Sequence, residues 1–335
     1  MTLYAVEAID DAIKATRAFL WPFDRGRWVR LAVIIFFVGG TGGFAPFQFT
    51  GSAPTGPGPG SEAPLPSGPP SPEFVAPGGV ELLVIAVIFA LIASVVLGFL
   101  FVGSVMEFVF VESLRREAVS IRRYWRDRWR LGARLFGFRL LFGVLTLVVI
   151  VAILAAILWP LLVGDGGFAL GLVFLAIPVF VIVGIVSGLV GGFTTNFVVP
   201  IMLLEDRALL ASWRRFWPTL TGQWKQYLAY AVVSFILQIA AGILASIATV
   251  FGALVVAIPL GIVGLVGVAL LSVVEAVGWI LIAVAALIFV LAIFVLGLLV
   301  AVPVQTYLRY YALFVLGDTE VDFDLIAERR EAVRE

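Results

Sequence analysis

The chain has 335 residues, of which 62% are hydrophobic and only 13% are charged, with 22 basic and 22 acidic side chains. Because soluble domains average about 25% charged residues, this composition excludes an ordinary soluble protein, and we expect no nucleic-acid partner. The absence of Cys and His removes disulfides, thiolate and imidazole metal ligands and the usual general base, so we expect no enzyme activity, no metal and no cofactor.

The first 27 residues predict an amphipathic helix at the cytoplasmic surface of a membrane. Between residues 4 and 21, apolar and charged side chains recur at helical spacing. The apolar side comprises Val6, Ile9, Ile13 and Leu20, and the polar side comprises Glu7, Asp10, Asp11, Lys14 and Arg17.

A first helical hairpin is predicted over residues 28–112. Its apolar runs at 28–47 and 80–111 are long enough to cross a bilayer. The first run ends among residues that weaken or kink a helix, which are Gly39, Gly40, Gly42, Gly43 and Pro46. Residues 51–79 hold nine Pro and seven Gly, a composition typical of an exposed linker.

A second hairpin is predicted over residues 140–204, after a basic surface segment at 113–139. Its two spans, 140–163 and 168–204, are separated only by the Gly-Asp-Gly-Gly sequence of residues 164–167. So short a break predicts a tight turn between antiparallel helices.

A third hairpin is predicted over residues 227–316, after a second basic segment at 205–226 and before an acidic tail at 317–335. One interpretation is two long helices joined near Glu275, and the other inserts a further pair of spans or a re-entrant segment between residues 252 and 272. The latter interval contains Pro259, Gly261, Gly264 and Gly267, which fit a turn or a closely packed helix face. We favour two crossings with an irregular or membrane-dipping connection.

The distribution of Lys and Arg predicts the orientation. All 22 fall in four segments, which are 1–30, 113–139, 207–225 and 309–335. The segments 51–79, 164–167 and 251–280 contain none. Under the positive-inside rule, both termini and the two basic connections are cytoplasmic, the Pro/Gly linker is external, and six spans of the cell membrane satisfy this arrangement with the fewest crossings.

Tryptophan-containing motifs recur along the chain. Residues 21–28 and 217–224 both read W-P-x-x-x-G-x-W, while 120–125 and 212–217 read S-I-R-R-Y-W and S-W-R-R-F-W. Each copy precedes a predicted hairpin, which indicates three internal repeats. We therefore predict an all-α integral membrane bundle of about six helices in three repeated hairpins, with cytoplasmic amphipathic surface helices.

Two groups of residues are candidate sites. The repeated basic and aromatic segments predict contacts with lipid headgroups through Arg122, Arg123, Trp125, Arg214, Arg215 and Trp217. Simple anchoring of surface helices explains the same residues, because basic and aromatic side chains are usual at a cytoplasmic membrane boundary.

The second group is polar and lies within or near the spans: Glu107, Asn196, Gln238 and Gln305. An acid inside a membrane is a functional candidate, but Glu107 lies close to the inner boundary, which favours an ion pair with a nearby arginine. Hydrogen bonds between helices explain the amides, and a substrate pathway would require them to converge.

Four stretches carry a resemblance to known proteins: V-P-I-M-L-L-E-D at 199–206, S-W-R-R-F-W-P at 212–218, Q-W-K-Q-Y-L at 223–228 and Y-A-L-F-V-L-G-D at 311–318. In these, the chain resembles an uncharacterised family of multi-pass membrane proteins from halophilic archaea. It is more distantly similar to the membrane domain that precedes the catalytic domain of some bacterial glycerophosphodiester phosphodiesterases. Neither resemblance implies an activity or a catalytic residue.

Three functions fit the sequence. The first is a non-enzymatic scaffold, lipid-handling protein or accessory factor, with membrane lipids and especially anionic headgroups as its partners. The second is a transporter or channel with a path between the hairpins, and the third is a membrane-bound enzyme of lipid metabolism. Protein partners and oligomeric state stay open.

Overall fold

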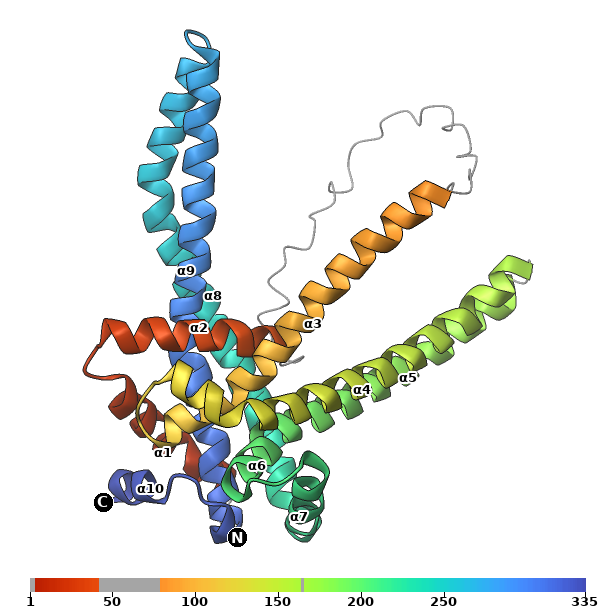
Figure 1. Ribbon diagram of the computed structural model, residues 1–335, viewed down its shortest axis with the longest axis vertical. Coiled ribbons are helices and arrows are strands. Elements are labelled where there is room, and N and C mark those ends of the chain that lie inside the picture. The colour runs from red at the N-terminus through yellow and green to blue at the C-terminus, as the bar shows by residue number, and fades with distance from the viewer. Residues whose placement is uncertain (1–3, 42–78, 164–165) are drawn as a thin grey trace.

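The computed structural model describes residues 4–41, 79–163 and 166–335 (Figure 1). Within these ranges the chain forms helices and turns and contains no strand. The α-helices are α1 (Tyr4–Leu20), α2 (Arg25–Thr41), α3 (Gly79–Arg115), α4 (Ile121–Val163), α5 (Gly166–Phe193), α6 (Val199–Glu205), α7 (Leu209–Gly222), α8 (Trp224–Leu270), α9 (Glu275–Thr319) and α10 (Ala327–Arg334). A π-helix, η2 (Thr194–Val198), joins α5 to α6, and a short 3-10 helix, η3 (Val321–Phe323), follows α9.

Five helical stretches of the described chain are long and apolar enough to cross a membrane, and they run over Gly79–Arg115, Ile121–Pro160, Leu170–Glu205, Trp224–Leu270 and Glu275–Thr319. The predicted class, an all-helical membrane protein, is therefore confirmed. Figure 1 shows that these helices form three arms that diverge from one end: α3 by itself, α4 with α5, and α8 with α9. We define the arms as residues 79–100, 140–190 and 231–300, and the base as the remaining described residues.

The base contains most of the buried side chains. The last turns of α3 and α9 are buried without interruption, over residues 103–114 and 309–317, and residues 197–203 of η2 and α6 join them. Aromatic rings fill the centre, with Phe197 stacked on Phe216 and Tyr230 stacked on Tyr311 at centroid separations of 5.5 and 5.4 Å. Burial of such side chains is the main favourable term in folding.

The arms bury little apart from small residues. In the α8–α9 pair, the buried arm residues are Ser234, Ala245, Gly267, Gly278 and Ala285. Small residues allow membrane helices to approach closely, and the larger apolar side chains of both helices point outward. The outer surface of the arms is therefore suited to lipid.

Helix α2 covers the start of the first predicted span. It crosses the base beside α3 and α9 (Figure 1) and buries Leu31, Ile34, Ile35 and Val38. The end of that span, its predicted kink at Gly42, Gly43 and Pro46, and all but the last residue of the 51–79 linker lie outside the described residues. The five stretches above therefore do not include a crossing by this segment.

Helix α1 is present as predicted, and its buried face includes four alanines. Ala5, Ala8, Ala12 and Ala15 are fully buried, whereas Val6 and Ile13 are about half exposed, at 54% and 52%. Alanines let α1 approach the end of α9 closely, where the Tyr311 hydroxyl donates to the Ala5 carbonyl at 2.9 Å. Val6 and Ile13, from the predicted apolar side, therefore lie outside this packed face.

The basic segment at 113–139 is not a separate surface element. The chain turns at residues 116–120, and residues 121–139 are the first turns of α4, which continues unbroken to Val163. Gly132 allows α4 to cross close to α3, because a Cβ at that position would lie 2.7 Å from the Val105 Cα. The close crossing of α3 and α4 joins the basic segment to the core.

The predicted irregular connection between 251 and 277 is also wrong, and so is the extra pair of spans. Helix α8 runs through Pro259 to Leu270, and α9 begins at Glu275 after a tight turn. Apolar surroundings favour a continuous helix, because backbone N–H and C=O groups that lose their helical hydrogen bonds find few other partners there. Gly267 and Gly278 lie where the two helices meet near the turn.

The acidic tail folds back onto the base. Arg330 pairs with Asp318 and Asp324 at 3.2 and 3.3 Å, and Arg334 pairs with Asp318 and with Asp11 of α1, both at 2.8 Å. Hydrogen bonding to Asp318 and Asp11 raises the pKa of Arg334 above its usual value. The two ends of the described chain are thereby joined.

Candidate functional site

An open pocket of about 910 Å³ lies in the base where α2 meets the turn before α4. Its lining is Arg30, Ser120, Ile121, Arg122, Arg123, Trp125 and Arg126. Three of the six predicted headgroup residues are therefore brought together, and Arg30 joins them from a segment about 90 residues earlier in the chain.

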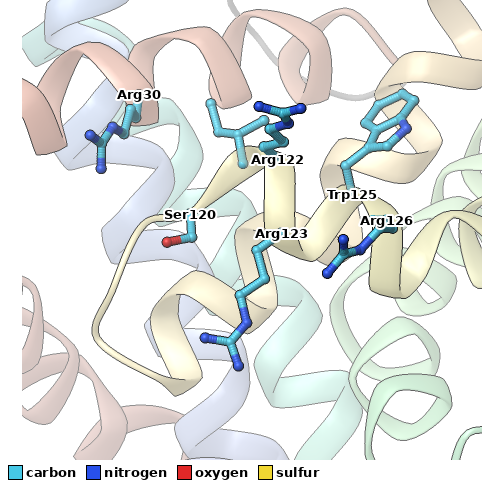
Figure 2. Close-up of a pocket in the computed structure, with 7 residues that line it drawn as sticks. Arg30, Ser120, Arg122, Arg123, Trp125 and Arg126 are labelled. Atoms are coloured by element: carbon cyan, nitrogen blue, oxygen red, sulfur yellow. The ribbon is translucent and has the colours of Figure 1, made fainter.

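The four arginines approach the pocket from different directions. Figure 2 shows Arg122 and Trp125 on the side of α4 that faces α2, while Arg123 points to the other side. Arg30 Nη1 donates to the Val119 carbonyl at 3.1 Å, which fixes α2 against the turn. The sequence spacing explains the arrangement, because residues three apart share a helix face and consecutive residues do not.

The pocket is strongly positive. Within the described part of the chain, neither Arg122 nor Arg123 lies within ion-pair distance of a carboxylate, and Arg126 reaches only Asp127, at 3.9 Å. Both Arg122 and Arg123 are exposed. Guanidinium groups without acidic partners are suited to bidentate contacts with phosphate oxygens.

The backbone adds further donors to this pocket. The Tyr124 N–H donates to the Ser120 carbonyl at 3.1 Å, which identifies Ser120 as the residue that precedes the first turn of α4. The first N–H groups of a helix have no partner within the helix and lie at the positive end of its dipole. Ser120 and the first turn of α4 thus reinforce the attraction for anions.

Trp125 connects the pocket to the apolar first arm. It is half-buried, and its ring meets Phe101 of α3 edge to face at a centroid distance of 6.4 Å. Residue 101 comes directly after the exposed part of α3. A tryptophan between a basic pocket and an apolar arm is typical of the headgroup level of a membrane.

The second predicted headgroup group, on α7, is not part of the pocket. Arg215 is held within the protein by Glu205 at 3.6 Å and Asp322 at 3.1 Å, and its guanidinium lies over the Phe323 ring. Arg214 and Trp217 are exposed on α7. The two R-R-x-W motifs therefore have different surroundings.

Glu107 lies in a buried charged cluster where all three arms begin. It is fully buried on α3 and pairs with Arg309 of α9 and, at 3.4 Å, with Arg139 of α4. The expected ion pair is present, but with two arginines. A buried carboxylate requires such partners, because an unpaired charge away from water is costly.

The π-helix η2 supplies the neutral acceptors of this cluster. Arg309 donates to the Thr195 carbonyl at 2.7 Å and to Asn196 Oδ1 at 3.3 Å, and Arg139 donates to Thr195 Oγ1 at 3.0 Å. On the outer side, Trp213 of α7 donates to Thr194 Oγ1 at 3.2 Å. Hydrogen bonds therefore run from a surface helix to the centre of the base.

The remaining amides do not join Asn196. Gln238 Nε2 donates to Ser234 Oγ one turn earlier on α8, at 3.1 Å, and Gln305 lies half-buried on α9. The structure gives Asn196 and Gln238 different partners. Of the four predicted polar residues, Glu107 and Asn196 thus both contact Arg309, whereas Gln238 is bonded to Ser234.

Sequence reasoning missed several residues of these sites. Arg30, Arg139 and Arg309 were considered only as part of the charge distribution, although each makes a contact over a long sequence separation. An arginine within the nearly uncharged stretch at 227–316, where the other charged residue is Glu275, was a usable signal, because a buried arginine requires a partner.

Comparison with known proteins gives a family but no activity. No curated protein and no solved structure matches the chain. The similarity to proteins of halophilic archaea and to glycerophosphodiester phosphodiesterases stays a prediction. A family model described as a family of unknown function, DUF7544, matches residues 3–326. The protein therefore belongs to this family of unknown function, DUF7544.

Proposed function

We propose that the protein is a non-enzymatic, lipid-handling scaffold of the cell membrane whose base binds anionic lipid headgroups. The observation that carries this proposal is the pocket at the start of α4, which collects four arginines and no carboxylate among its lining residues. A headgroup phosphate matches these guanidinium groups in charge and geometry.

The position of the pocket supports a lipid as its ligand. Trp125 lies between the arginines and Phe101, and the part of α3 that precedes Phe101 is an exposed apolar helix. A lipid bound here would place its phosphate at the arginines and its chains along the first arm. The burial pattern supports the same depth, because the exposed apolar stretch of α3, Val80 to Leu97, spans roughly 27 Å at 1.5 Å per residue, close to a hydrocarbon core of about 30 Å.

The proposal includes an orientation. All four basic segments of the sequence lie at least partly in the base, and so do both ends of the described chain (Figure 1). Under the positive-inside rule the base is cytoplasmic, and the α8–α9 turn and the 51–79 linker are external. Six crossings in three hairpins complete this proposal.

The proposal is tested by the lipid that copurifies with the protein. We expect the R122Q/R123Q variant to lose most of the anionic lipid seen by native mass spectrometry with wild-type protein. The matched control is K14Q/R17Q, which removes two exposed positive charges from α1. Arg215 is left intact because it is engaged within the protein.

Unchanged anionic lipid in R122Q/R123Q would refute the proposal. Equal losses in both variants would also count against it, because they would indicate attraction by net charge and no defined site.

A further inference from the structure

We infer that the pocket at the start of α4 takes a ligand with two phosphate groups, as in a diphosphate or a lipid headgroup with two phosphodiesters. This inference rests on the proposed function and names the class of anion at the same site. Three observations support it: the pocket carries four positive charges, its arginines lie on two sides of α4, and the first turn of α4 supplies backbone N–H donors between them.

The charge of the pocket exceeds what one phosphodiester neutralises. Arg30, Arg122, Arg123 and Arg126 contribute four positive charges, and the lining includes no acid. The nearest carboxylate is Asp127, 3.9 Å from Arg126 and itself half-exposed. A single phosphodiester carries one negative charge, which would leave most of the repulsion among these guanidinium groups in place.

The arginines define two binding directions. Consecutive residues of an α-helix lie about 100° apart around its axis, and Figure 2 accordingly shows Arg122 and Arg123 on different sides of α4. Arg30 comes from α2, on the side of α4 that Arg122 faces (Figure 2), whereas Arg126 lies one turn after Arg123. A ligand with two linked phosphates can present one phosphate to each side.

The first turn of α4 lies between the two directions. Ser120 and the free N–H groups of this turn provide donors that either phosphate can use. Ile121 and Trp125 add an apolar wall next to Phe101 of α3. This wall favours a ligand with a hydrocarbon part, although the two-phosphate chemistry is shared by soluble diphosphates.

The test measures binding to the full chain in nanodiscs of neutral phosphatidylcholine. Cardiolipin, which has two phosphodiesters, and phosphatidylglycerol, which has one, are titrated in at equal negative charge. We expect cardiolipin to bind about 10-fold more tightly. In R123Q/R126Q this preference should fall to about 1-fold, because only Arg30 and Arg122 remain to bind a phosphate and neither lipid gains from a second one.

Inorganic pyrophosphate distinguishes the two sources of such a ligand. Displacement of cardiolipin by pyrophosphate, but not by orthophosphate at equal charge, would assign the site to the diphosphate group itself. Retention of cardiolipin would assign it to the lipid.

Equal affinity for cardiolipin and phosphatidylglycerol in wild-type protein would overturn this inference and leave the proposed function standing. If neither lipid binds more tightly than phosphatidylcholine, the proposed function fails as well. A cardiolipin preference that survives in R123Q/R126Q would also overturn the inference, since the second direction would then play no part.

Discussion

The base and the arms are built from the same helices but are stabilised in different ways. In α3, residues from Val80 to Leu97 are exposed and apolar, whereas residues 103–114 of the same helix are buried. The buried part carries Glu107 and Glu112, and the exposed part carries a charge only at its start, at Glu81. One helix can therefore be suited to lipid over one part of its length and pack within a protein core over the other. Its ion pairs lie in the part that belongs to the core.

The same kind of ion pair recurs in the base at the ends of three helices. Glu112 pairs with Arg128 at 3.5 Å, Glu205 with Arg215 at 3.6 Å, and Asp318 with Arg334 at 2.8 Å. In each case the acid ends a helix that returns from an arm, and the arginine belongs to the segment that follows. The arms contain no comparable ion pair among the described residues, so disruption of the base should cost far more stability than disruption of an arm.

The largest effect is expected from E107Q. Neutralisation of Glu107 leaves Arg309 and Arg139 buried without a countercharge, which should lower the free energy of unfolding by about 3–5 kcal/mol. Unfolding in increasing SDS measures this loss. The control is E7Q on the exposed side of α1, and a similar small change in both variants would show that the cluster is not essential to the base.

A matched pair of leucines compares the two regions directly. Leu313 is 1% exposed in the base, and Leu244 is 67% exposed on an arm. L313A should lower the free energy of unfolding by about 2–5 kcal/mol, whereas L244A should change it by less than about 0.5 kcal/mol. The same SDS assay checks both, and equal losses would contradict the division into base and arms.

Two glycines of α4 test the crossing of α3 and α4. A Cβ on Gly132 would meet the Val105 backbone, but Gly137 has nothing within 4 Å. G132A should therefore cost about 1–3 kcal/mol through overpacking, while G137A should be neutral or stabilising by up to about 1 kcal/mol. Destabilisation of similar size in both would indicate that helix contacts at this crossing are absent.

The smallest effect is expected from R334Q. Its ion pairs with Asp318 and Asp11 are partly exposed, since 39% of the Arg334 side chain is accessible. Such ion pairs contribute about 0–1 kcal/mol to the free energy of unfolding, so R334Q should lower it by no more than this amount. Hydrogen exchange should nevertheless accelerate in α10 and stay unchanged in α9. Exchange that rises equally in α9 would show that the tail stabilises the whole base.

Much of this architecture could be predicted from the sequence because it depends on local composition. Long apolar runs identified the five candidate crossings, and the Gly-rich sequence at 164–167 marked the boundary between α4 and α5. The course of α8 was not predictable in the same way. Pro259 and the nearby glycines interrupt helices in water, but their apolar surroundings here keep the helix continuous.

The sites could be predicted only in part, because their contacts join distant segments. Arg122, Arg123 and Trp125 stand out in the sequence, but nothing local indicates that Arg30 lies beside them. Likewise, the contact between Glu107 and Arg309 spans 202 residues. The buried alanines of α1 recur at helical spacing, at residues 5, 8, 12 and 15, but only the contact with α9 identifies this face as the packed one.

The central claim is that the arms cross the membrane and the base stays on its cytoplasmic side. Because the chain has no cysteine, single cysteines can be introduced at Thr221, exposed at the end of α7, and at Ser272, exposed in the α8–α9 turn. The account predicts that a membrane-impermeant maleimide labels S272C in intact cells and labels T221C only after permeabilisation. Labelling of both positions from the same side would contradict it.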